Sequence, residues 1–117
     1  MSSADTKVLI EQTVQRFEED VPALKPLNLV LRVVLQAQGN VPVWRVEVPG
    51  PKVSKDPAAD ARIDVSMPRT FFNEMAKDAR IEDWAEAYEH GYVKVTGDEA
   101  VIRLLGNVIE RRRARAH

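Results

Sequence analysis

The stretch from Asp83 to Leu105 constrains the fold most, because it changes between helical and extended patterns at very short intervals. Its first segment ends at Gly91, where a glycine can take the left-handed conformation that closes a helix. Tyr92 to Thr96 then alternates with a period of two and is rich in strand formers. Gly97 allows a sharp turn, and Asp98 can cap the amphipathic helix that follows. The stretch therefore predicts a helix, a strand and a helix joined by short connections.

We expect the first helix of this unit to begin with Asp83 as its N-cap. An aspartate in that position accepts a hydrogen bond from an N–H group of the first turn. Glu86, three residues later, completes an aspartate version of the capping box.

Hydrophobic periodicity predicts the elements upstream. Residues 5–21 form an amphipathic helix that Pro22 and Pro26 terminate, since proline cannot continue a helix. Residues 27–38 alternate strictly and predict a strand, and residues 41–48 predict its hairpin partner after a Gly39-Asn40 turn. The interpretation of Lys52 to Lys55 stays open between a third strand and a loop, and residues 56–60 predict a loop.

A further strand and helix precede the opening unit. Residues 61–67 alternate with Ile63, Val65 and Met67 on one face, and Pro68 fits the first turn of a helix. Phe71, Phe72, Met75, Ala76 and Ala79 give that helix an apolar stripe. The order of elements predicts an α+β domain whose helices cover mainly one face of a small sheet.

These motifs together resemble the sterol carrier protein 2 domain family. Its C-terminal signature has an aromatic-containing helix, a glycine, an apolar-Lys-apolar strand, a Gly-Asp turn and paired leucines. The matching residues here are Ala87-Tyr88, Gly91, Val93-Lys94-Val95, Gly97-Asp98 and Leu104-Leu105. Trp44-Arg45-Val46-Glu47 and residues 61–67 followed by Phe71 resemble two upstream strands of the family. The resemblance covers roughly residues 28–110.

The resemblance implies one fold and one class of function. The fold is a five-stranded mixed sheet with a hydrophobic tunnel under its helices. The function is binding, and often transfer, of sterols, fatty acids, acyl-CoA or related lipids without covalent chemistry. This chain has a short segment at 50–60, and His90 stands where relatives commonly have an aromatic residue. The tunnel is therefore expected to be either open to a ligand or closed by side chains.

Apolar side chains of the second half of the chain are the candidates for lining such a cavity. Aromatic and methionine side chains line apolar pockets, and methionine adapts to irregular ligands. Trp84 and Tyr88 lie four residues apart on one helix face and each carries a polar atom for a ligand head group. The same residues also suit a packed core. The candidates are Phe71, Phe72, Met75, Trp84, Tyr88, Val101, Leu104, Leu105 and Val108.

Catalytic motifs are poorly represented. The sequence has no G-x-S-x-G, H-E-x-x-H, Walker or G-x-G-x-x-G pattern, and no cysteine for a thiolate or a zinc site. His90 and Glu86 are four residues apart and suit either a surface helix pair or an acid–base pair. His117 ends the chain. We expect no enzyme, cofactor or metal.

Composition restricts the partners and the location. A chain of 117 residues fits one domain over residues 1–117. The net charge of −1 with 30% charged residues gives no global basis for binding nucleic acid. No apolar run is long enough to span a bilayer, and no secretory signal is visible, so a cytoplasmic location is expected.

Four arginines near the end of the last helix form the remaining distinct feature. They suit a helix C-terminus, where the dipole favours cations, and equally a transient contact with acidic lipid head groups. They are Arg111, Arg112, Arg113 and Arg115. The alternative to a lipid carrier is an interaction module with a filled cavity, acting as a homodimer or as a subunit of a larger assembly.

Overall fold

The computed structural model describes residues 3–39 and 41–115, and it does not describe the side chains of residues 3, 4, 113 and 115. The Gly39-Asn40 turn lies partly outside the described residues, and His117 lies wholly outside them. In chain order the elements are α1 (Ser3–Asp20), the 3₁₀ helix η1 (Pro22–Leu27), β1 (Leu29–Gln36), β2 (Val43–Val48), β3 (Lys52–Ser54), β4 (Ile63–Pro68), α2 (Arg69–Asp78), α3 (Ile81–Glu89), β5 (Lys94–Gly97) and α4 (Glu99–Arg115).

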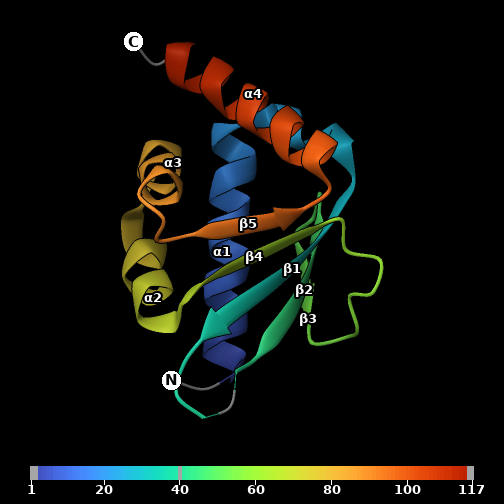
Figure 1. The fold of residues 1–117 in the computed structure, drawn as a ribbon, viewed down its shortest axis with the longest axis vertical. Coiled ribbons are helices and arrows are strands. Elements are labelled where there is room, and N and C mark those ends of the chain that lie inside the picture. The colour runs from blue at the N-terminus through green and yellow to red at the C-terminus, as the bar shows by residue number, and fades with distance from the viewer. Residues whose placement is uncertain (1–2, 40, 116–117) are drawn as a thin grey trace.

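The five strands form one mixed sheet in the order β3-β2-β1-β4-β5. β1 pairs with β4 in parallel, and the other three pairings are antiparallel. The parallel pair is possible because the chain returns through β2 and β3 before it reaches β4. Figure 1 shows β5 at the edge of the sheet, directly after α3 and directly before α4. The predicted α+β class with a five-stranded mixed sheet is confirmed.

Strand register places the apolar residues of neighbouring strands on the same face. Val33 of β1 lies between Trp44 of β2 and Val65 of β4. The next position, Arg32, lies between Arg45 and Asp64 and belongs to the opposite, polar face. Because side chains alternate along a strand, this register directs one face to a core and the other to solvent.

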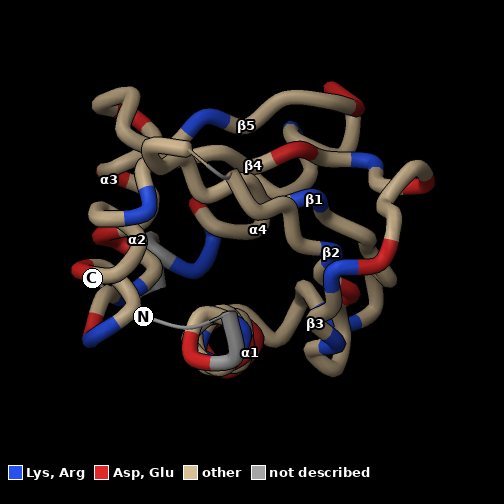
Figure 2. The backbone as a smooth tube through the Cα atoms, turned by 90° about the horizontal axis from the view of Figure 1, so that it is seen from below, with Lys and Arg blue, Asp and Glu red and all other residues tan. Residues whose placement is uncertain are grey.

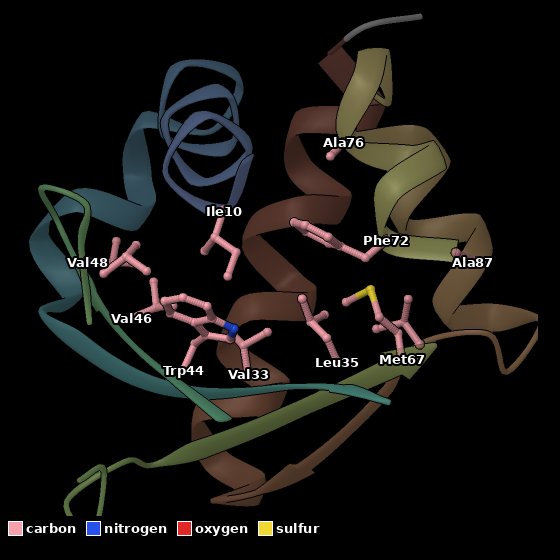
Figure 3. Close-up of a cluster of buried hydrophobic side chains, with 12 residues drawn as sticks. Ile10, Val33, Leu35, Trp44, Val46, Val48, Met67, Phe72, Ala76 and Ala87 are labelled. Carbon is pink, nitrogen blue, oxygen red and sulfur yellow. The ribbon is translucent and has the colours of Figure 1, made fainter. Parts of the chain in front are cut away.

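The helices pack on the apolar face of the sheet, as the alternation predicted. Figure 2, seen nearly along α1, shows this helix beside the inner surface of the curved sheet. Figure 3 shows Ile10 of α1 and Phe72 of α2 pointing toward Leu35 and Trp44 of the sheet. The buried residues of this main core are Ile10, Val33, Leu35, Trp44, Val46, Val48, Val53, Met67, Phe72, Ala76, Ala87 and Val93.

Two predicted helix starts were wrong. Pro68 is the last residue of β4, with φ −62° and ψ 140°, and α2 begins one residue later. It stays extended because it continues the parallel pairing, opposite Gln36. α3 begins at Ile81 rather than after Asp83, because Ile81 is buried against Val21 and Leu24 and extends the helix into the core.

The strand predicted over residues 27–38 begins two residues late. Leu27 ends η1, and Asn28 follows in the left-handed conformation with φ 50°. Pro22, which was expected only to end α1, also starts this 3₁₀ helix, and Pro26 lies inside it, since the fixed φ of proline suits this conformation. The open interpretation of Lys52 to Lys55 resolves to the short strand β3, and residues 56–60 have no regular element.

Candidate functional site

Helices α2 and α3 follow each other directly in the chain, and hydrogen bonds close the end of α2 and the start of α3. The N–H of Ala79 donates to the carbonyl of Met75 at 2.9 Å, which ends α2. The Asp83 carboxylate accepts a 2.8 Å hydrogen bond from the N–H of Arg80, so it closes the start of α3 from its third residue. Asp83 therefore serves the capping box in the role that glutamate usually has.

The C-terminus of α3 closes with a Schellman motif, and this motif positions Tyr92. The N–H of Tyr92 donates to the carbonyl of Ala87 at 2.9 Å, and that of Gly91 donates to Tyr88 at 3.1 Å. Gly91 has the expected left-handed φ of 81°. The chain consequently reverses at once, and the Tyr92 ring stacks on Phe71 of α2 with ring centroids 5.3 Å apart.

A groove of about 300 Å³ opens on the surface between α2 and α3, beside Tyr92. Its apolar wall consists of Phe71, Met75, Ala87 and Tyr92, whereas Asp83, Glu86 and His90 supply the polar part of the lining. Ala87 belongs to the main core, and Phe71 and Met75 pack against that core. The floor of the groove is therefore the outer surface of the core between sheet and helices.

A second hollow of about 250 Å³ lies on the other side of Tyr92, toward the sheet. Its lining is more polar and includes Gln36, Ser66 and Lys94. Ser66 and Lys94 are paired across β4 and β5. Tyr92, which is 58% exposed, thus borders both the groove and the more polar hollow.

Comparison with known proteins connects this geometry to one fold. No protein-family model matches the sequence, and no curated protein matches it. The crystal structure of sterol carrier protein 2 like 2 from Aedes aegypti aligns at a TM-score of 0.56 and 19% identity, over 88% of this chain and 98% of its own. The chain has the sterol carrier protein 2 fold. The resemblance expected from the sequence is thereby confirmed at the level of the fold.

Two further structures agree with this assignment of the sterol carrier protein 2 fold. The solution structure of the palmitated form of the same Aedes aegypti protein aligns at a TM-score of 0.56 and 19% identity, over 86% of this chain and 93% of its own. The ubiquinone synthesis protein UbiJ-SCP2 aligns at a TM-score of 0.52 and 18% identity, over 97% of this chain and 96% of its own. At sequence identities of 18–19%, this structural similarity establishes a common fold and nothing beyond the fold.

On this sterol carrier protein 2 fold, the predicted cavity residues separate into several places. Phe71 and Met75 line the groove. Phe72 is buried in the main core, and Trp84 lies between Phe17 and Phe72, with ring centroids at 5.8 Å and 6.4 Å. Tyr88 is 49% exposed and is not among the residues that line the groove. The shared cavity border predicted for Trp84 and Tyr88 stays a prediction.

The candidates on α4 pack elsewhere, against the start of the sheet and against η1. Val101 is buried with Leu29 and Ile63, whereas Leu105 and Val108 pack against the small cluster that contains Leu24. Leu104 is 44% exposed. Side chains of the main core occupy the layer between sheet and helices, and the tunnel that the resemblance implied stays a prediction.

Sequence reasoning missed Ala87 and Tyr92 as groove residues. Tyr92 was expected in the strand, but β5 begins at Lys94, and the Schellman closure turns Tyr92 toward α2. An aromatic residue directly after a C′ glycine is the signal that points to this position, because that residue commonly packs back on the helix. Nothing in the sequence distinguishes Ala87 from other core alanines.

The polar side chains of the groove, those of Asp83, Glu86 and His90, are exposed. Glu86 and His90 both line the groove, and the backbone N–H of His90 donates to the carbonyl of Glu86 at 2.9 Å. Among the described residues, no hydrogen bond or ion pair joins their two side chains. Within residues 3–39 and 41–115, no group of three or more histidine, aspartate or glutamate side chains is arranged to hold a metal ion. No helix in the described part of the chain is long and apolar enough to cross a membrane.

The basic end of α4 is partly engaged in the fold. Arg112 donates from Nε to the backbone carbonyl of Asp20 at 2.6 Å and so ties α4 to the end of α1. Arg111 is exposed, and the side chains of Arg113 and Arg115 lie outside the described residues. At the other end of α4, the Asp98 carboxylate accepts hydrogen bonds from the N–H groups of Ala100 and Val101, which confirms the predicted cap.

Proposed function

We propose that this protein binds an apolar lipid, whose chain enters along the groove between α2 and α3 and continues into the main core. The observation that carries the proposal is the groove floor, where Phe71, Met75 and Ala87 belong to or pack against the core beneath them. A ligand chain in the groove would therefore contact side chains that already form part of the main core or pack against it.

Physical estimates support this class of ligand. The groove volume of about 300 Å³ lies at the lower end of the range for small-molecule sites. Each buried methylene contributes about 0.8 kcal/mol, so a long alkyl chain needs few polar contacts. Two structures of the same fold have names that mention palmitate and ubiquinone synthesis, and both terms concern molecules with long apolar chains. Binding of this kind requires no covalent step.

Mass spectrometry under native conditions tests the proposal on the protein as purified, followed by extraction of any bound species. The delipidated protein is then titrated with palmitic acid, cholesterol and 2-undecanone. Met75→Glu places a charge on the apolar wall and should weaken binding about tenfold or more. Val8→Glu is the matched control, because Val8 is 48% exposed on α1, away from the groove. Failure of every ligand to bind the folded protein would refute lipid binding.

The proposal extends to transfer of the lipid to a membrane. Of the four arginines at the end of α4, Arg111 is the one whose described side chain is exposed. An exposed arginine attracts anionic lipid head groups by about 1 kcal/mol near the surface. Co-sedimentation with vesicles containing phosphatidylserine should fall in 0.5 M salt and with Arg111→Ala. Equal sedimentation with neutral vesicles would argue against this contact.

A second candidate function is self-association through α4, and one observation favours it. Leu104 is 44% exposed on a helix whose other large apolar residues are packed. An exposed leucine on an ordered helix suits a homodimer or an assembly contact. Sedimentation equilibrium gives the mass, and Leu104→Lys should convert a dimer to a monomer. If the wild-type protein is a monomer at high concentration, self-association through α4 is excluded.

A further inference from the structure

The indole N–H of Trp44 is a buried donor without an acceptor. Trp44 lies in β2 and is 3% exposed, and its Nε1 atom has no hydrogen-bond partner among the described residues. The other such side-chain atom in the described chain is Asn73 Oδ1 on α2. Buried donors in native proteins nearly always have a partner, because an unpaired donor loses its hydrogen bond to water without replacement.

The surroundings of this N–H are apolar on every labelled side. Figure 3 shows the indole lying on the inner face of the sheet, with its nitrogen toward Val33 and Ile10 and Leu35 nearby. All three residues belong to the same buried cluster as Trp44. Lys55 Nζ lies over the indole ring, 5.0 Å from its centroid. This cation–π contact explains an aromatic ring at position 44 but leaves the N–H unused.

The apolar surroundings restrict what can accept this hydrogen bond. A buried water needs two to four polar partners, and the side chains labelled beside the N–H, those of Ile10, Val33 and Leu35, offer none. A carboxylate would carry its charge into the apolar interior at a large cost. A hydroxyl would accept the bond but would leave its own hydrogen unpaired. A carbonyl oxygen on an otherwise apolar molecule has neither disadvantage.

We propose that Trp44 is an interior anchor that selects a neutral apolar ligand carrying a carbonyl group. The Nε1–H donates to the carbonyl oxygen, while the alkyl part of the ligand lies along the core toward Phe72 and the groove. This inference rests on the proposed lipid binding, and it adds the position and the chemistry of the polar contact. The carbonyl group of the ligand is thus recognised inside the protein. The charged side chains at the groove, Asp83 and Glu86, stay in solvent.

Nuclear magnetic resonance of the ¹⁵N-labelled protein observes this N–H directly. The two tryptophans give two indole N–H signals, and Trp84→Phe assigns them. The probes are 2-undecanone and n-undecane, which match in length and differ by one carbonyl oxygen. We expect the ketone to shift the Trp44 N–H signal downfield, and the alkane to bind without that shift.

An isosteric variant separates the hydrogen bond from packing. Replacement of Trp44 by benzothienylalanine exchanges the N–H for sulfur and keeps the ring size. The variant should bind 2-undecanone about 3- to 10-fold more weakly, as expected for one net hydrogen bond, and n-undecane with unchanged affinity. Trp84 replaced in the same way is the control and should leave the preference for the ketone intact.

The outcomes separate this inference from the function on which it rests. Equal binding of ketone and alkane, or ketone binding with an unshifted Trp44 signal, overturns the anchor and leaves lipid binding in place. A nuclear Overhauser contact from the Trp44 N–H to a bound water in the ligand-free protein also overturns it. Absence of binding by both probes and by the lipids above refutes the function and the anchor together.

Discussion

Gly97 shows how one residue without a side chain holds β5 against its neighbour. Its φ of 126° lies in the region that favours glycine, and an added Cβ would lie 2.4 Å from the carbonyl oxygen of Arg62. The backbone of Arg62 cannot move aside easily, because its carbonyl also accepts a hydrogen bond from the N–H of Asp98 at 2.9 Å. The glycine is therefore required both for conformation and for space.

Gly97→Ala should lower the free energy of unfolding by about 2–3 kcal/mol, since backbone strain and a close contact combine. Chemical denaturation measures the change. Gly106→Ala is the matched control, because Gly106 lies within α4 with no heavy atom within 4 Å of an added Cβ. It should raise stability by about 1 kcal/mol, as alanine favours a helix. Equal effects at the two positions would contradict the role given to Gly97.

At the scale of an element, the start of α4 depends on Asp98. The Arg62 guanidinium, hydrogen-bonded to this carboxyl at 2.9 Å, and the N–H groups of Val101 and Ala100 hold the pKa of Asp98 below its ordinary value. A carboxyl with a lowered pKa in the folded protein stabilises it above the unfolded pKa of about 4. That contribution is lost as the pH falls through the lower, folded value.

Asp98→Asn should keep the N-cap and remove the charge, because asparagine caps a helix as well as aspartate does. We expect a lower melting temperature than the wild type at pH 7, and a difference that shrinks as the pH falls below about 4. Thermal denaturation followed by circular dichroism from pH 2 to 7 tests this. Asp56→Asn, in the exposed segment after β3, serves as the control. A pH-independent difference for Asp98→Asn would argue against the charge.

At the scale of the whole molecule, the C-terminal end of α1 is held by hydrogen bonds from two distant parts of the chain. Beyond its apolar face, the end of α1 accepts the Arg112 hydrogen bond from α4, which joins residues 92 positions apart. Glu18 is buried near the same end and accepts a hydrogen bond from the N–H of Gly50 at 3.2 Å. The layer that covers the proposed ligand chain is thus closed by contacts that are distant in sequence.

Arg112→Ala should lower the free energy of unfolding by about 1–2 kcal/mol, because it removes a charge-assisted hydrogen bond at a partly buried site. Arg111→Ala should change it by no more than about 0.5 kcal/mol, as expected for an exposed side chain. Urea denaturation compares the two neighbouring variants. If Arg111→Ala proved the more destabilising, the assignment of the structural role to Arg112 would be wrong.

Local patterns predicted nearly all elements, and the misses have a tertiary cause. Alternation identified the strands, and Gly91 and Asp98 fixed two helix ends, because these signals act within a few residues. The starts of α2 and α3 were assigned wrongly, because Pro68 pairs with Gln36 in the sheet and Ile81 is buried beside Val21. Such contacts join residues far apart in the chain, and no local pattern contains them.

The residues of the candidate site were likewise predicted only in part. The sequence marked Phe71 and Met75 as ligand-contacting residues, and they line the groove. It did not separate them from Phe72 and Val101, because a core and a ligand cavity are lined by the same residue types. The unpaired Nε1 of Trp44 was also invisible, since an acceptor for an indole could come from any segment.

The sequence by itself determined most of the order of helices and strands, the helix ends at Gly91 and Asp98, and the division of the predicted strands into an apolar and a polar face. These features depend on backbone preferences and on the spacing of side chains along one segment. The tertiary structure decided which apolar residues became core, which became the groove beside Tyr92, and which donor stayed unpaired. Those outcomes depend on the distances between segments, which exist only after the sheet and helices have packed.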